Sequence, residues 1–220
     1  MKKFNAGLAL LVVAICALLS FNPGNAYADT VTLKLESVGG QQSDGDYVFP
    51  YNFSYNGSAF TVPLMCVSYY DHISVGESWT ATITQIAGNT QYEEAAYIFS
   101  LAAAPGASAD TIAEAQWANW DLFETNESSA AFLSGVVPSN YQSDVTTILN
   151  NATSYVAANP NSSLYSDYEV FIPLSGWPSG DSTPQTFIGD SPTPEPGSLV
   201  LLGTGMLGLA TTLYRRKRIA

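Results

Sequence analysis

The spacing of hydrophobic residues predicts β-strands over the first part of the chain. Segments 31–37 and 79–86 alternate hydrophobic and polar residues, which is typical of strands with one buried face. Segment 47–55 is aromatic and extended, and it ends at the turn Asn56-Gly57. Segment 60–70 is apolar on both faces, as expected of a buried central strand. These four segments are expected to form a sheet.

Helical spacing replaces this alternation after about residue 90. Three segments have the helical period, residues 92–104, 110–123 and 141–158. Asp110 is the expected N-cap of the second helix. Two more strands are predicted at residues 168–174 and 185–188. The predicted fold class is therefore α+β, a sheet or sandwich-like domain with an insertion of two to three helices.

The first 28 residues have the pattern of a secretory signal peptide. Lys2 and Lys3 precede an apolar run at residues 8–21, which is short for a membrane span. Ala26 and Ala28 place small residues at the two positions that signal peptidase inspects. Cleavage after Ala28 is predicted, and an uncleaved anchor is the alternative.

The C-terminal end predicts a membrane anchor. Residues 191–197 form a proline-rich linker, and residues 198–214 are free of charge. A helix over 198–214 would be about 26 Å long, close to the short limit for a transmembrane helix. A basic tail at 215–220 follows, with Arg215, Arg216, Lys217 and Arg218 as the membrane stop on the cytoplasmic side. The alternative, a buried core helix, does not account for four adjoining cations.

The remaining segment, residues 29–190, is predicted to be one strongly acidic ectodomain. All 19 acidic residues lie between Asp29 and Glu195, and Lys34 is the only base in that stretch. Such a surface repels phosphate backbones, so nucleic acid is excluded as a partner. The acidic turn at residues 43–46 is either a solvated turn or a weak site for divalent cations, and the solvated turn is preferred.

Conventional catalytic groups are scarce, so no enzyme activity and no cofactor are expected. The chain has one histidine, His72, and Cys66 is the only cysteine left after removal of the signal peptide. One cysteine and one histidine cannot complete a zinc site. If the predicted strand continues through both, six residues separate them by about 20 Å, too far for a nucleophile and base pair.

The C-terminal residues resemble a known sorting signal. The motif Pro194, Glu195 and Pro196, an apolar segment with three glycines and the terminal basic cluster resemble the PEP-CTERM signal of Gram-negative exporters. The resemblance implies processing by an exosortase, a membrane transpeptidase, and a place at the cell surface or in a biofilm matrix. The same tail is also known as an ice-binding protein C-terminal domain. A sorting signal does not identify the function of the domain that it carries.

Two short motifs of the ectodomain resemble those of thioester domains, which are known from surface adhesins of Gram-positive bacteria. Cys66 follows Met65 in an apolar strand, and Gln116 lies on the apolar face of the second predicted helix, beside Trp117 and one turn before Trp120. The resemblance implies that Cys66 and Gln116 condense with loss of ammonia, inside a pocket formed by Met65, Trp117 and Trp120. The alternative is a buried, inert cysteine and a glutamine that hydrogen-bonds to the backbone.

Together these patterns predict a non-enzymatic surface or matrix adhesin module with an internal thioester that couples to amines. One alternative is a non-covalent structural protein of the exopolysaccharide matrix. A third is an ice-binding face, because Thr80, Thr82 and Thr84 form a row on one side of a strand. Threonine also favours strands in general, and an ice-binding face requires many such rows.

Overall fold

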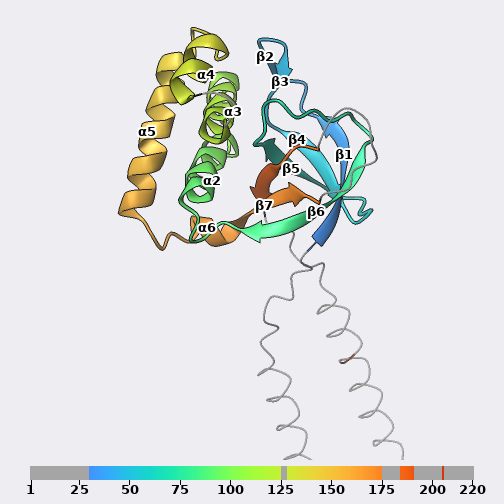
Figure 1. Ribbon diagram of the computed structural model, residues 1–220. Coiled ribbons are helices and arrows are strands. Elements are labelled where there is room, and N and C mark those ends of the chain that lie inside the picture. Colours follow the sequence, from blue (N-terminus) through green and yellow to red (C-terminus); the bar gives the residue numbers. More distant parts are fainter. Residues whose placement is uncertain (1–29, 125–127, 175–183, 191–204, 206–220) are drawn as a thin grey trace, which may run out of the picture.

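The computed structural model describes residues 30–124, 128–174, 184–190 and 205. Six antiparallel strands form a closed barrel, and a layer of helices lies along one side of it (Figure 1). The strands are β1 (Thr30–Val38), β4 (Tyr51–Tyr55), β5 (Thr61–Cys66), β6 (Ser78–Gln85), β7 (Tyr168–Pro173) and β8 (Phe187–Asp190). The α+β class is confirmed.

The closed barrel corrects the predicted sandwich-like arrangement. The strand order around the barrel is β1-β4-β5-β8-β7-β6, and β6 pairs back onto β1. The last strand, β8, lies between β5 and β7 and pairs with both. Because this strand fills the gap between the two halves of the sheet, no edge strand remains in the barrel.

A small hairpin divides the strand that was predicted over residues 47–55. Strands β2 (Gln42–Ser43) and β3 (Asp46–Tyr47) pair with each other, outside the barrel. Asp44 and Gly45 form the turn between them with positive φ, a conformation that glycine adopts freely. The barrel strand β4 begins only after Pro50, which has no backbone N–H to donate to a ladder.

The three long helices are confirmed, with small shifts of their ends. They are α2 (Thr90–Ala102), α3 (Ala109–Phe123) and α5 (Gln142–Ala158), and two short helices, α4 (Ser129–Gly135) and α6 (Leu164–Asp167), add to them. The predicted N-cap Asp110 is wrong. The Ser108 side chain accepts a hydrogen bond from the backbone N–H of Thr111, so Ser108 caps α3 and Asp110 lies in its first turn.

The strand register decides which side chains fill the barrel. Directly paired residues point to the same face, so the pair Cys66 and Phe187 shares one face. Phe187 lies 4.7 Å from Phe53 and 6.2 Å from Trp79 between ring centroids, and all three are buried inside the barrel. Cys66 therefore belongs to the inner face, at the end of β5.

Alternation along the strands sends other hydrophobic residues outward, under the helices. Met65 and Ile188 form a pair on the outer face, and both are fully buried. Helix α3 packs against β5 and α2 against β8, with α5 behind both (Figure 1). Every residue of α3 from Ala115 to Asp121 is buried. The amphipathic helix that the sequence predicts is thus surrounded by protein along this stretch.

Gly189 in β8 lies in close contact with β5. A Cβ added there would lie 2.4 Å from Leu64 Cδ2 and 3.1 Å from the carbonyl oxygen of Pro63. We expect Gly189→Ala to lower the free energy of unfolding by about 1–3 kcal/mol, because strand β8 must move away from β5. Urea unfolding of the full chain measures this. Gly135→Ala is the matched control, since its Cβ meets no atom within 4 Å. Equal midpoints for the two variants would contradict the prediction.

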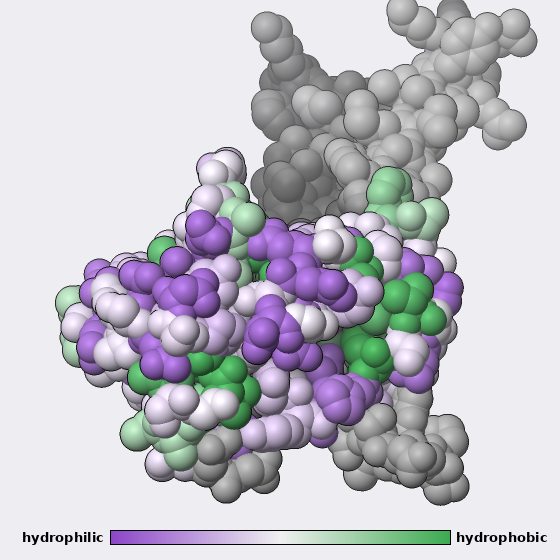
Figure 2. All heavy atoms as spheres, turned by 90° about the horizontal axis from the view of Figure 1, so that it is seen from above, coloured by the Kyte–Doolittle hydropathy of each residue, from purple (hydrophilic) through white to green (hydrophobic). Residues whose placement is uncertain are grey.

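The face of the molecule drawn in Figure 2 is largely polar. Figure 2 shows one face of the molecule, on which hydrophilic residues predominate and hydrophobic areas are small. The predicted membrane helix at 198–214 lies outside the described residues, apart from position 205. Within the part of the chain that the structure describes, no helix has both the length and the hydrophobicity needed to cross a membrane.

Candidate functional site

Cys66 ends strand β5 and is completely buried as a free thiol. Its sulfur donates a hydrogen bond to the backbone carbonyl oxygen of Ser68, 3.1 Å away. Strand β5 forms four ladder pairs with β4, and β8 holds its end through the pair Cys66 and Phe187. The backbone at the thiol is therefore held by β8, whereas the ladder with β4 ends two residues earlier, at Leu64.

Two side-chain amides from helix α3 meet the backbone of this cysteine. Gln116 Nε2 donates to the carbonyl oxygen of Cys66 at 2.7 Å, and Asn119 Nδ2 donates to the same oxygen at 2.9 Å. Both amides are fully buried. Positions 116 and 119 are one helical turn apart, so α3 presents both toward the end of β5. The structure thus places Gln116 against the backbone of Cys66, and this contact is the backbone hydrogen bond that the alternative to the thioester describes.

The oxygen atoms of the two amides have no hydrogen-bond partner among the described residues. Gln116 Oε1 and Asn119 Oδ1 are buried without a donor. Leaving a buried polar atom unpaired costs about 1–3 kcal/mol. Both amides have their nitrogen on the Cys66 carbonyl, because that oxygen can only accept. The geometry therefore leaves the Gln116 carbonyl group without stabilisation by a donor.

The surroundings of the thiol strongly disfavour a negative charge. Burial is the main cause that raises the pKa of Cys66 to about 12. The indole of Trp120 and the Ser68 backbone lower this pKa, whereas the charge of Asp71 raises it further. The indole N–H of Trp120 is near enough to the sulfur to lower the pKa of the thiol, but it forms no hydrogen bond of standard geometry. A neutral sulfur, as in a thiol or a thioester, is favoured over a thiolate in such a site.

A cluster of aromatic rings lies at this end of α3, and Trp120 in it lies beside the thiol. Trp117 and Trp120 lie 4.9 Å apart between ring centroids, and Tyr69 lies 5.1 Å from Trp120. The indole N–H of Trp117 donates to Ser43 Oγ at 2.9 Å, which ties the β2–β3 hairpin to α3. Met65 lies on the opposite face of β5 from the thiol, beneath the helices. Of the predicted pocket residues, Trp120 lies beside the thiol and Trp117 packs against Trp120, whereas Met65 faces away from the sulfur.

His72 lies on the loop after β5, because the strand predicted over residues 60–70 ends at Cys66. Beyond that point the chain leaves the barrel as a loop, so the distance calculated along a strand does not apply. His72 is exposed on this loop and lines the same cavity as Trp120. The threonine row at Thr80, Thr82 and Thr84 lies on the outer face of one barrel strand, which curves with the barrel.

Sequence reasoning missed two residues of the site. Asn119 stands where the resemblance implies an apolar residue, and only its spacing of three from Gln116 indicated a shared face. Gln185 lies just before β8, and its Nε2 donates to the backbone carbonyl oxygens of Ser68 and Asp71. It thereby holds the loop that follows Cys66. No sequence pattern indicated this contact.

The terminal motifs fall outside the described residues. These are Ala26 and Ala28 of the signal peptide, Pro194, Glu195 and Pro196 of the sorting motif, and Arg215, Arg216, Lys217 and Arg218 of the membrane stop. The boundaries predicted there remain predictions. Among the residues that the structure describes, no cluster of three metal-ligating side chains occurs.

Comparison with known proteins identifies the C-terminal end. The PEP-CTERM protein-sorting motif matches residues 192–218. This motif marks an exported protein that is sorted by an exosortase and associated with the cell envelope. No curated protein and no solved structure matches this chain.

Proposed function

We propose that the ectodomain is a non-enzymatic surface adhesin module in which Cys66 and Gln116 form an internal thioester. The observation that carries the proposal is the contact between the Gln116 amide and the Cys66 backbone, 2.7 Å from nitrogen to oxygen, in a fully buried site. A thiol and an amide held in one place react as if highly concentrated.

The condensation balances without any further reactant. The Cys66 sulfur bonds to Cδ of Gln116, the bond from Cδ to Nε2 breaks, and the thiol proton leaves with that nitrogen as ammonia. A target amine later attacks Cδ, the bond from carbon to sulfur breaks, and the thiol is restored. The product is an amide between Gln116 and the target. Since Cys66 and Gln116 each react once, this is attachment rather than turnover.

The surroundings suit a stored thioester. A thioester is uncharged, and burial that raises the pKa of Cys66 to about 12 favours an uncharged sulfur. Trp120 and Tyr69 restrict the approach of water, which would hydrolyse the bond. The motif at residues 192–218 brings the domain to the cell envelope, where it can meet amines on other surfaces.

Mass spectrometry of the exported full-length protein tests the proposal. We expect an intact mass short by one ammonia molecule relative to the unmodified sequence. Methylamine should add to Gln116 and raise the mass by one methylamine molecule. The same reaction should release one thiol, which chymotryptic peptide mapping should locate at Cys66. Cys66→Ala and Gln116→Ala should each have the full mass of their own sequence and no reaction with methylamine.

Full mass in the wild type, with Cys66 alkylated only after unfolding, would contradict the thioester. The domain would then be a non-covalent component of the exopolysaccharide matrix, which is the second candidate. Its supporting observations are the strongly acidic composition of the domain and the largely polar face that Figure 2 shows, which favour solubility in a hydrated matrix.

A further inference from the structure

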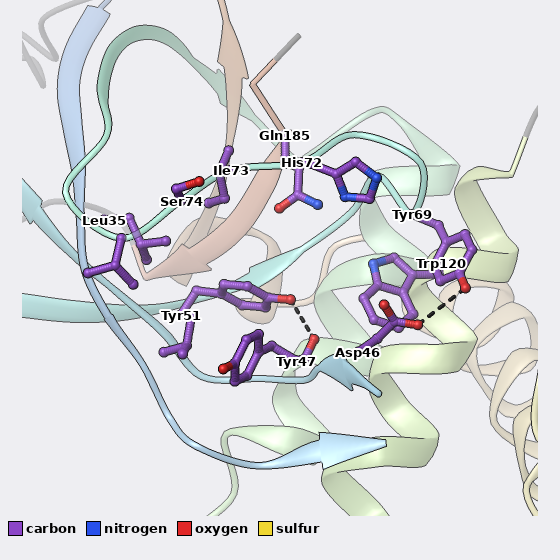
Figure 3. Close-up of a pocket in the computed structure, with 12 residues that line it drawn as sticks. Leu35, Asp46, Tyr47, Tyr51, Tyr69, His72, Ile73, Ser74, Trp120 and Gln185 are labelled. Atoms are coloured by element: carbon purple, nitrogen blue, oxygen red, sulfur yellow. Dashed lines mark hydrogen bonds between the residues drawn. The ribbon is translucent and has the colours of Figure 1, made fainter. Parts of the chain in front are cut away.

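A cavity of about 340 Å³ opens between the barrel, the β2–β3 hairpin and helix α3 (Figure 3). Its walls come from strands β1 and β4, the β2–β3 hairpin, the loop after β5, helix α3 and the residues just before β8. Trp120 lines the cavity and also lies against the Cys66 sulfur. One indole ring is therefore shared by the cavity and the candidate thioester.

Aromatic side chains form much of the cavity wall. Tyr51, Tyr69 and Trp120 point toward it, and Tyr47 stands at its rim with 44% of its surface exposed. Burial, followed by the charge of Asp46, raises the pKa of Tyr69 to about 12, so this phenol stays neutral. Faces of neutral tyrosine and tryptophan rings attract cations and also pack against alkyl chains.

A carboxylate supplies negative charge at the same place. Asp46, on β3, lines the cavity and accepts a hydrogen bond from the Tyr69 hydroxyl at 3.2 Å through Oδ2. The ion pair that the structure describes, Lys34 with Glu36, does not involve Asp46. Asp46 thus offers acceptor capacity beyond its bond to Tyr69.

Gln185 adds a buried acceptor with no partner. The residue is only 6% exposed, and its amide points toward the cavity (Figure 3). Its Nε2 must face the carbonyl oxygens of Ser68 and Asp71, because both of these can only accept. This fixes Oε1 on the other side of the amide, where it is buried without a hydrogen-bond donor. An unpaired buried acceptor favours a ligand that carries hydrogen-bond donors.

We propose that this cavity binds the side-chain ammonium of a lysine from another protein and delivers it to the thioester. The ammonium carries three donors and a positive charge, which match Gln185 Oε1 and the Asp46 carboxylate. Its unbranched alkyl chain lies along the rings of Tyr51, Tyr69 and Trp120. The delivery step rests on the proposed thioester, whereas ammonium binding depends on the cavity alone.

Other ligands fit the cavity less well. Asp46 and the acidic domain around it repel anions. A neutral apolar ligand would leave Gln185 Oε1 without a donor. A divalent cation needs several oxygen or nitrogen ligands in one place, and no cluster of three such acidic, histidine or cysteine residues is found in the described ranges.

The covalent step takes one amine and releases the thiol. The bound ammonium gives one proton to solvent, and its nitrogen attacks Cδ of Gln116. The carbon–sulfur bond breaks and the sulfur takes the second proton from the nitrogen. Trp120 lines the cavity and also lies beside the sulfur, so we expect its ring to shift during this attack.

The first test compares two nucleophiles on the exported full-length protein. We expect Asp46→Asn to slow the reaction with N-acetyl-lysine methylamide about tenfold, because a charge contact to the ammonium is lost. The rate with hydroxylamine, which is largely uncharged at neutral pH, should stay the same. Asp44→Asn is the matched control: it removes the same charge from the same hairpin, at a residue that does not line the cavity. Equal effects of the two variants would overturn the proposal.

The second test does not need a thioester. In Cys66→Ala, or in Cys66→Ser if the alanine variant does not fold, we follow binding of N-acetyl-lysine methylamide by NMR. The neutral analogue N-acetyl-norleucine methylamide should bind about tenfold more weakly, and Asp46→Asn should remove this difference. If both ligands bind equally, the cavity does not recognise ammonium. A full wild-type mass together with selective lysine binding would refute the thioester alone and retain the ammonium site.

Discussion

Trp117→Ala is expected to lower the free energy of unfolding by about 3–5 kcal/mol, which is enough to unfold many domains of this size. Trp117 is among the largest fully buried side chains, and its ring contacts Tyr69, Trp120 and Phe132. No neighbouring side chain can fill the space, because the surrounding segment of α3 is itself buried on all sides. The variant therefore leaves a large cavity between α3 and the barrel.

Trp117→Phe separates the loss of ring volume from the loss of the hydrogen bond. Phenylalanine retains most of the ring contact but leaves Ser43 Oγ without the indole N–H. We expect this variant to lose about 1 kcal/mol and to loosen the β2–β3 hairpin that carries Asp46. Urea unfolding followed by tryptophan fluorescence and circular dichroism measures both variants. A loss below about 1 kcal/mol in Trp117→Ala would mean that the helical layer is not packed on the barrel as described.

The strands and long helices were predictable because their signals are local. Alternation marks β1 and β6, and helical spacing followed by proline or asparagine marks α2 and α5. The barrel was not predictable in the same way. Its closure depends on β8, a four-residue strand that pairs with β5 more than 100 positions earlier in the chain. A short apolar segment contains no information about which distant strand it will join.

The site was predictable only where chemistry marked it. A lone cysteine in an apolar strand and a glutamine among helical tryptophans are unusual residues in their surroundings, and in the structure the glutamine amide contacts the backbone carbonyl of that cysteine. Asn119 and Gln185 act through contacts with backbone carbonyls. Such contacts depend on tertiary packing, because almost any segment of chain offers a carbonyl oxygen. The sequence therefore does not distinguish a loop glutamine that donates to backbone carbonyls from a loop glutamine that is exposed to solvent.

Asn119 has a role that follows from the chemistry of its neighbour. Before condensation, the Cys66 carbonyl oxygen accepts bonds from both Gln116 and Asn119. Thioester formation removes the Gln116 nitrogen as ammonia, so Asn119 Nδ2 becomes the remaining side-chain donor to that buried oxygen. The polar residue at this helix position thus stabilises the product more than the starting state.

Asn119→Leu should therefore reduce the thioester fraction about tenfold, as read from the fraction of exported full-length protein that lacks one ammonia. The substitution removes the donor and keeps a side chain of similar size, so packing changes little. In the Cys66→Ala background, where Gln116 keeps its nitrogen on the same carbonyl, Asn119→Leu should cost little free energy of unfolding. This pair of measurements distinguishes a role in the product from a general role in folding. An equal loss of stability in both backgrounds, with an unchanged thioester fraction, would mean that Asn119 only supports the packing of α3 against β5.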